Sequence, residues 1–353
     1  MDILRLAGVP GVGKSTVAWA VARQLTADGV RVGYVDIDQL GMCYPAPSED
    51  PDRWDLKEVA LQRVAARFAE AGVERLVVSG VADPADPPRA NGHPTVSLWL
   101  DADEATRRAR LAPRGWPQKQ VDDVLAVGTA EAAAAHPSWA RVATDGSAVE
   151  ETVRIVLERP SPGSVATPAE FPRREPDVAG RIIWITGPRC AGASSVGWEI
   201  AAESWRAGQR TGFVDVAQLG FVWNVDRTVG LRNTTSLQRL FAGAGARTLV
   251  AVAPFEMSPA AVRDAFPGSD IRFFRLDADD DTRRARALQG AAGTGPLLAG
   301  DDLIGASPQA VDDIVALGAR QRQTPVRAGE LLIGRAGMSA SEVAEQVRAH
   351  LPD

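Results

Sequence analysis

The chain repeats one ordered set of sequence blocks, and this repeat constrains the fold more than any other feature. Leu-Asp-Ala-Asp-Glu-Ala-Thr-Arg-Arg-Ala-Arg at 100–110 returns at 276–286 as Leu-Asp-Ala-Asp-Asp-Asp-Thr-Arg-Arg-Ala-Arg. The stretch 4–40 is matched by 183–219, and the Val-Asp-Asp block near 121 returns near 311. Because the blocks keep their order, we interpret the 353 residues as a tandem duplication of one domain.

Each copy alternates short apolar runs with segments of helical periodicity. In the first copy we expect strands at 3–7, 32–35, 76–78, 96–100 and 141–143, and helices at 15–25, 56–71, 104–111 and 148–157. Strands separated by helices of this length favour a parallel sheet covered on both faces. The expected fold class is therefore α/β, with two tandem domains that each contain a parallel sheet flanked by helices.

A proline-rich segment separates the two copies. Residues 160–180 contain five prolines, which disfavour helix and remove backbone donors, so we predict an extended linker there. The predicted domains are 1–159 and 181–353. The second copy also carries an insertion at 289–307, rich in Gly, Ala and Asp, which we expect to be a mobile loop.

Composition excludes several classes of protein. The net charge of −6 argues against a nucleic-acid-binding surface, although a local basic patch is compatible with it. No apolar run approaches the roughly 18 residues that span a bilayer, and the N-terminus lacks the basic region of a signal peptide. Two cysteines, Cys43 and Cys190, form no disulfide or metal pattern. We expect a cytoplasmic protein without a membrane or nucleic-acid partner.

Residues 8–15 read Gly-Val-Pro-Gly-Val-Gly-Lys-Ser, the complete Walker A pattern between an expected strand and an expected helix. Glycines let backbone amides turn toward a phosphate, and the helix N-terminus adds its positive end. Lys14 reaches the β and γ oxygens, and the Ser15 hydroxyl ligates Mg²⁺. The pattern predicts a P-loop NTPase domain that binds ATP and Mg²⁺ through Gly8, Gly11, Val12, Gly13, Lys14, Ser15 and Thr16.

Two acidic residues follow the next strand, in Val35-Asp-Ile-Asp-Gln39. Alternation along a strand would place Asp36 and Asp38 on one face, near Mg²⁺ and the γ-phosphate. The arrangement resembles the small-molecule kinases of the P-loop superfamily, such as shikimate, gluconate and adenylylsulfate kinases. The block at 35–41 also resembles one in actinobacterial ATP-binding proteins. The kinase resemblance implies that Asp36 or Asp38 orients Mg²⁺ or accepts the acceptor's proton. The alternative is a solvated turn that caps the next helix.

The same resemblance implies roles for residues farther along the chain. Ser79 and Gly80 would lie against the acceptor, whereas Asp83 would be a second acid that supports Mg²⁺; a plain strand-to-loop transition explains each equally well. Arg110 and Arg114 would belong to a lid that clamps the transferring phosphoryl group. The alternative is a solvated helix face on which Arg107 and Arg110 pair with nearby acids.

Two further groups of residues are candidates for ligand contacts. Thr144-Asp-Gly-Ser147 occupies the place at which the resembled kinases hold adenine, or it is simply a cap and turn. Aromatic and sulfur-containing side chains are either lining for an acceptor pocket or ordinary packing residues. They are Met42, Cys43, Tyr44, Trp116 and Trp139.

The second copy has lost polar residues at three separate places. Ala193 stands where the first copy has Lys14, Ala217 replaces Asp38, and the strand ending at Pro254 lacks the Ser-Gly pair. Arg189 lies in the second loop and replaces the lysine only in part. We therefore expect a catalytically degenerate copy with either a structural role, as an intramolecular pseudo-dimer partner, or a regulatory one.

Together these features predict an enzyme, an ATP-dependent kinase that phosphorylates a small-molecule acceptor in its first copy. The competing hypothesis is an ATP-binding switch or ATPase that acts on a partner and yields no phosphorylated small molecule. A third is a scaffold that binds nucleotide for stability alone.

Overall fold

The computed structural model describes residues 1–89, 92–159, 180–223, 228–293, 303–334 and 337–351. The chain forms two compact units. Unit 1 comprises Met1–Gly41, Trp54–Pro172 and Gly220–Val229, and unit 2 comprises Met42–Arg53, Arg173–Leu219 and Gly230–Asp353. The predicted linker, apart from Gly180, lies outside the described residues, as does the middle of the predicted loop at 289–307.

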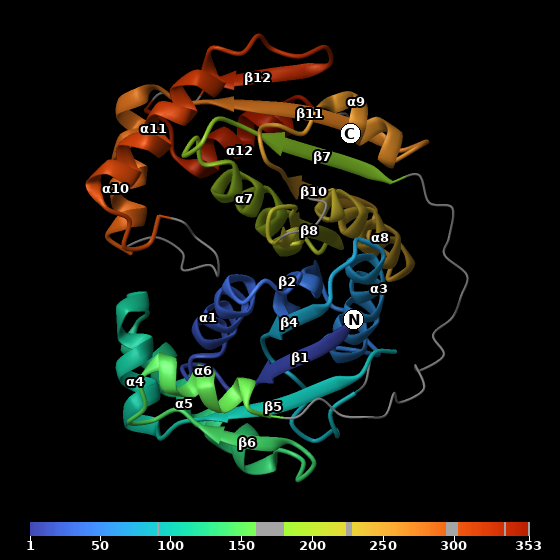
Figure 1. Cartoon of the computed structure of the whole chain (residues 1–353). Helices are drawn as coiled ribbons and strands as arrows, with labels where there is room; N and C mark the ends of the chain where they lie inside the picture. The colour runs from blue at the N-terminus through green and yellow to red at the C-terminus, as the bar shows by residue number, and fades with distance from the viewer. Residues whose placement is uncertain (90–91, 160–179, 224–227, 294–302, 335–336, 352–353) are drawn as a thin grey trace. The chain divides into compact units, whose positions relative to one another are not determined.

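Unit 1 is an α/β sandwich built on a six-stranded sheet of order β6-β5-β1-β4-β2-β9 (Figure 1). Its strands are β1 (Asp2–Ala7), β2 (Val32–Asp36), β4 (Arg75–Ser79), β5 (Thr95–Asp101), β6 (Ala140–Ala143) and β9 (Phe221–Val222). Its helices are α1 (Lys14–Ala27), α2 (Ile37–Leu40), α3 (Trp54–Glu70), α4 (Glu104–Leu111), α5 (Gln118–Ala134) and α6 (Val149–Leu157), with a short 3₁₀ turn at Ala112–Arg114.

Unit 2 repeats this plan in the order β12-β11-β7-β10-β8-β3. Its strands are β3 (Cys43–Tyr44), β7 (Arg181–Thr186), β8 (Thr211–Asp215), β10 (Thr248–Val252), β11 (Asp270–Asp277) and β12 (Glu330–Gly334). Its helices are α7 (Ala193–Arg206), α8 (Val229–Gly243), α9 (Pro259–Ala265), α10 (Asp280–Ala291), α11 (Pro308–Arg322) and α12 (Ala340–Ala349). The α/β class predicted from the sequence is confirmed for both copies.

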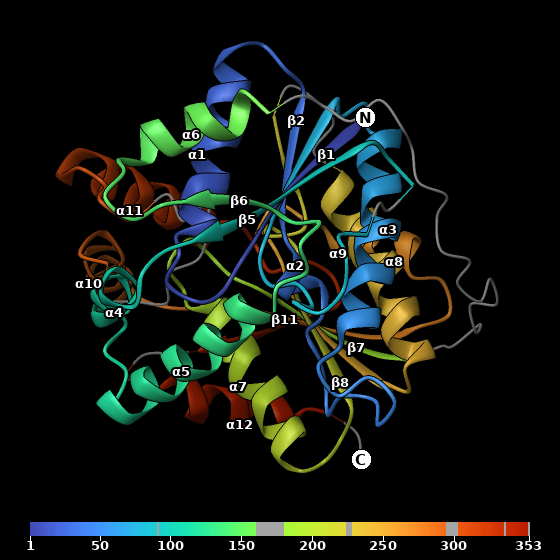
Figure 2. The same ribbon diagram turned by 90° about the horizontal axis from the view of Figure 1, so that it is seen from below.

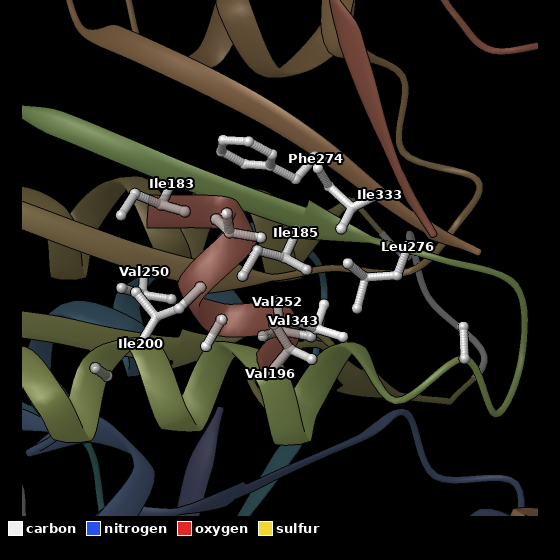
Figure 3. Close-up of a cluster of buried hydrophobic side chains, with 14 of the residues drawn as sticks. Ile183, Ile185, Val196, Ile200, Val250, Val252, Phe274, Leu276, Ile333 and Val343 are labelled. Carbon is white, nitrogen blue, oxygen red and sulfur yellow. The ribbon is translucent and has the colours of Figure 1, made fainter. Parts of the chain in front are cut away.

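The core of unit 2 shows how the periodic apolar residues are used. Ile183 and Ile185 project from one face of β7 onto Val196 and Ile200 of α7, and Val343 of α12 closes the same cluster (Figure 3). Alternation along the strand and helical spacing along α7 bring these side chains together. In unit 1, α1 packs beside α6 in the same way (Figure 2).

Within each sheet five strands are parallel and the sixth is antiparallel. The antiparallel strand comes from the other copy of the repeat. In unit 1, β9 pairs with β2 through Tyr34 and Phe221, and in unit 2, β3 pairs with β8 through Tyr44 and Thr211. The two copies therefore exchange one short strand each, which the sequence did not lead us to expect.

Aromatic side chains hold the exchanged strand in unit 1. The Trp19 ring lies edge-on to Tyr34 at 5.1 Å, to Phe221 at 5.0 Å and to Trp223 at 5.2 Å between centroids. Edge-to-face pairs of this kind add to the free energy of burial. The edge of β2 is thus covered rather than left as an open template for another strand.

The exchange in unit 2 favours the packing alternative for three of the aromatic and sulfur-containing residues. The Tyr44 ring lies tilted against Trp205 at 4.9 Å between centroids, Cys43 is buried in β3, and Met42 packs on the core of unit 2. Arg210 also donates to the carbonyls of Pro45 and Ala46. These three residues are packing residues of unit 2.

None of the helices in the described part of the chain has the length and apolar character that a bilayer crossing needs.

We expect Phe221→Ala to destabilise unit 1, although Phe221 belongs by sequence to the second copy. The loss of its ring from Trp19 and Tyr34 should cost about 1–3 kcal/mol, because the residue is partly exposed. Hydrogen exchange resolved by residue should show faster exchange in β2, with Leu331→Ala on the exposed part of β12 as the control. Faster exchange confined to unit 2 would contradict the observed strand pairing.

Candidate active site

The P-loop joins β1 to α1 in a conformation that only glycine adopts readily. Gly8 and Gly13 have φ values of 145° and 91°. A Cβ atom on Gly8 would lie 2.5 Å from the carbonyl oxygen of Leu100, so the loop passes closely over the end of β5. Gly13 caps α1 without a side-chain hydrogen bond. The first amides of α1 therefore present the anion-binding end of the helix at this loop.

Lys14 begins α1 and bends back over the loop. Its Nζ donates to the carbonyl of Val9 at 3.0 Å. Burial lowers the pKa of Lys14, and the carboxylates of Asp38 and Asp36 oppose that shift. The predicted lysine and the predicted acids are thus close enough to interact electrostatically.

Asp36, at the end of β2, accepts hydrogen bonds from residues of several elements. Its carboxylate accepts from the Ser15 hydroxyl at 3.4 Å, from the Ser79 hydroxyl at 3.1 Å and from the backbone N–H of Asp38 at 2.9 Å. Tyr34, which the sequence did not single out, shares a 2.8 Å hydrogen bond with Ser79. Burial raises the pKa of Asp36 to about 6, and the charge on Asp38 adds to the shift.

Alternation with Asp36 predicted that Asp38 lies on the strand. This prediction is wrong. Strand β2 ends at Asp36, which caps α2, and Asp38 lies in the first turn of that short helix. Asp36 therefore caps the helix as the alternative predicted, because its carboxylate accepts from an amide at the helix start, but it is buried rather than solvated. The two carboxylates still converge: a Cβ atom on Gly80 would lie 3.0 Å from one and 3.3 Å from the other.

Lys57 is a site residue that the sequence analysis missed. Its side chain is 7% exposed, and its Nζ lies 3.1 Å from Asp38 and 4.6 Å from the centre of the Trp54 ring. A lysine inside the polar face of a long helix gives no sequence signal of its own. The pair with Asp38 depends on the packing of α3 against α2.

The arginines of α4 fall into two groups. Arg107 is 2% exposed and donates to the carbonyl of Pro10, and Arg110 donates to the carbonyls of Val12 and Thr144. Only Arg108 matches the solvated alternative, since it bonds Glu104 and Asp122 at the surface. Arg107 and Arg110 therefore hold the backbone of the P-loop.

The remaining predicted residues lie around this centre. Arg114 stacks on Trp116 at 4.8 Å, and its charge contributes to the lowered pKa of Lys14. Thr144 donates to the carbonyl of Val12, so the segment that was expected to meet adenine is tied to the P-loop. Asp83 accepts from the backbone N–H of Ala85 and faces a hollow near Arg5.

The residues predicted to hold Mg²⁺ fit that ion. Ser15 and Asp36 offer a hydroxyl and a carboxylate oxygen 3.4 Å apart. Mg²⁺ takes few protein oxygens and keeps several waters, so two such ligands beside a bound triphosphate suffice. No group of three or more acidic, histidine or cysteine side chains suited to a metal occurs in the described part of the chain.

The second P-loop keeps this geometry without the same charges. The Ser194 hydroxyl donates to Asp215 at 3.2 Å, Gly192 caps α7 with φ of 84°, and Arg286 donates to the carbonyl of Ala191. Ala193 and Ala217 take the places of Lys14 and Asp38. Burial raises the pKa of Asp215 as it does that of Asp36.

We expect Mg²⁺ binding in the presence of ADP to weaken as the pH falls through about 6. Asp36 must be ionised to bind a cation, and its raised pKa means that it takes up a proton near that pH. Below pH 6 the affinity should fall by about tenfold per pH unit, measured by calorimetry against ADP alone in the same buffers. Asp38→Asn should move the midpoint to lower pH, because it removes a repulsive charge. Equal affinity at pH 7 and pH 5 would refute the assignment.

Comparisons with known proteins found one matching family profile and several similar solved structures. Residues 5–133 match the family profile of an AAA domain. Among solved structures, a gluconokinase from Sinorhizobium meliloti 1021 is 15% identical, with a TM-score of 0.32 over 48% of this chain and 90% of that one. A sugar kinase from a Janibacter species is 22% identical, with a TM-score of 0.31 over 44% and 91%. No curated protein matches the chain. Residues 5–133 are thus similar to an AAA domain, and the Walker A pattern at 8–15 lies inside this stretch.

Proposed function

We propose that unit 1 transfers the γ-phosphoryl group of ATP to a hydroxyl group of a small-molecule acceptor. The observation that carries this proposal is the second carboxylate, Asp38, beside Gly80 at the edge of the phosphate site. Nucleotide binding needs Lys14 and Ser15, but a pure nucleotide-binding loop has no need of a further acid held by a buried lysine.

Each residue has a role in the proposed reaction. The amides of the P-loop and Lys14 bind the phosphates and stabilise the charge that develops on the transferring group. Ser15 and Asp36 would hold Mg²⁺, which supplies further charge neutralisation there. The hydroxyl oxygen of the acceptor bonds to the γ-phosphorus as the bond from that phosphorus to ADP breaks. Asp38 accepts the proton of this hydroxyl, and Lys57 orients the carboxylate of Asp38.

Lys14→Ala should lower transfer of label from γ-labelled ATP to a metabolite extract by about 10²- to 10³-fold. The melting temperature should change little, because the Lys14 Nζ donates to the carbonyl of Val9 within its own loop. If the label leaves only as inorganic phosphate from the wild-type protein, the chain is an ATPase or switch instead. A large loss of stability in the variant would favour the scaffold hypothesis.

We also propose that the second copy has a structural rather than a catalytic role. Corresponding serines provide a matched pair of variants, because Ser15 and Ser194 make the same bond to Asp36 and Asp215. Ser15→Ala should abolish Mg²⁺-dependent turnover, whereas Ser194→Ala should leave kcat within about twofold. Equal loss of turnover in both variants would show that the second P-loop takes part in the reaction.

A further inference from the structure

The face of the unit 1 sheet that α1 covers carries a connected set of polar side chains. Tyr34 and Asp36 are two positions apart on β2 and so point to the same face, and Ser79 lies opposite Asp36 on β4. Helix α1 supplies Ser15, which donates to Asp36, and one turn later Trp19, which packs on the tyrosine ring. Strand alternation, strand register and helical spacing therefore bring the five residues together.

The hydrogen bonds of this set run in one direction. Ser79 is 1% exposed and has a single hydroxyl proton, which it donates to Oδ2 of Asp36 at 3.1 Å. The oxygen of that serine lies 2.8 Å from the Tyr34 hydroxyl and must therefore accept from it. The result is a chain from tyrosine through serine to the carboxylate, in which each donor strengthens the next.

Packing fixes the position of the Tyr34 hydroxyl. The side chain is fully buried, with the Trp19 ring edge-on at 5.1 Å and the Phe221 ring tilted at 6.1 Å between centroids. A buried ring held on two sides has little freedom to turn, so its hydroxyl stays directed at Ser79. Phe221 lies on the exchanged strand β9, and this strand therefore supports the first member of the chain.

The second copy keeps the packing of this set and lacks both hydroxyl groups of the chain. Phe213 of β8 takes the place of the tyrosine, and Val252 of β10, which lies opposite Asp215, takes that of the serine. The aromatic pair is retained, because the Phe213 ring lies edge-on to Trp198 at 5.8 Å. The two hydroxyl groups are therefore not needed to build a P-loop unit, and they occur in the copy that has the P-loop lysine.

Ser79 holds the carboxylate of Asp36 independently of the P-loop serine. The backbone N–H of Asp38 donates to Oδ1, whereas Ser15 and Ser79 both donate to Oδ2, at 3.4 and 3.1 Å. When the Ser15 oxygen turns toward a cation, Ser79 still keeps the second carboxylate oxygen in place. In unit 2 the P-loop serine donates to the aspartate at 3.2 Å, and the valine beside them has no donor that could replace it.

We propose that Tyr34 and Ser79 are positioning residues that hold Asp36 in the orientation that binds Mg²⁺. Hydrogen bonds to a ligating carboxylate fix its direction, and their loss commonly weakens metal binding about 10- to 100-fold. The kinase resemblance implies an acceptor contact for Ser79 instead, but its hydroxyl is buried and already has two partners. The inference rests on the Mg²⁺ site of the proposed function and adds the residues that shape it.

The first experiment removes the hydroxyl groups one at a time. Tyr34→Phe introduces the residue that the second copy has at this position, so the ring packing is kept. Calorimetry at about pH 8, well above the pKa of Asp36, measures Mg²⁺ binding to the complex with ADP, and ADP binding in EDTA. The Mg²⁺ dissociation constant should rise about 3- to 10-fold in Tyr34→Phe and about 10-fold or more in Ser79→Ala. The ADP dissociation constant without metal should not change.

The second experiment asks whether the two hydroxyl groups act as one chain. Tyr34→Phe/Ser79→Ala should bind Mg²⁺ no more weakly than Ser79→Ala alone, because without the serine the tyrosine has no path to the carboxylate. Thr152→Val is the matched control, since it removes another buried hydroxyl of unit 1, one that donates to a carbonyl within α6. This control should leave the Mg²⁺ affinity unchanged.

Three results would contradict the inference. Unchanged Mg²⁺ affinity in both single variants would mean that the chain only stabilises the fold, and a lower melting temperature would then be its sole effect. Additive losses in the double variant would mean that Tyr34 does not act through Ser79. An equal loss of ADP affinity in EDTA would mean that the whole P-loop is distorted. If the expected Mg²⁺ losses occur in a protein that transfers no phosphoryl group, only the kinase proposal fails.

Discussion

The candidate site depends on the hydrogen bonds that the carboxylate of Asp36 accepts. This carboxylate joins the ends of three elements, because Ser15 comes from α1, Ser79 from β4 and the amide of Asp38 from α2. Parallel strands end at the same edge of the sheet, which is why Ser15 and Ser79, 21 and 43 positions from Asp36, meet it there. The same burial that makes these bonds strong raises the pKa of Asp36 to about 6. Asp36 therefore has two roles: its hydrogen bonds connect three elements, and its carboxylate can bind either a cation or a proton.

The sequence predicted the parts of this site that a local pattern specifies. Gly8, Gly13 and Lys14 lie within one loop, where the Walker A pattern by itself predicts left-handed glycines and the start of a helix, and the structure has both. Asp38 was assigned to the strand because nothing in Val-Asp-Ile-Asp signals that β2 stops at Asp36. Lys57 became visible only in three dimensions, since its partner Asp38 lies 19 positions away on another helix.

Elements that depend on tertiary contacts were harder to predict. The exchanged strands β3 and β9 contain two residues each, too few for a period of two to be detected. Helix α5 carries Val121 and Leu125 one turn apart, but its remaining residues are mostly small or charged, so its apolar face is narrow. Helix α4 was located correctly, yet its sequence did not show that Arg107 would be buried against the P-loop. Propensity located the helix, and only packing determined which of its arginines are solvated.

Comparison of the two copies shows which features of a P-loop unit belong to the fold and which to chemistry. The serine–aspartate bond is present at 3.4 Å in unit 1 and at 3.2 Å in unit 2, although Lys14 and Asp38 have no counterparts in the second copy. The bond therefore joins helix to sheet in both copies and does not depend on the lysine or on the second acid. Phe221 and Val222, which belong by sequence to the second copy, add the edge strand to the sheet that carries Asp36. A chain that lost this copy would expose the edge of β2, the strand on which the acid is built.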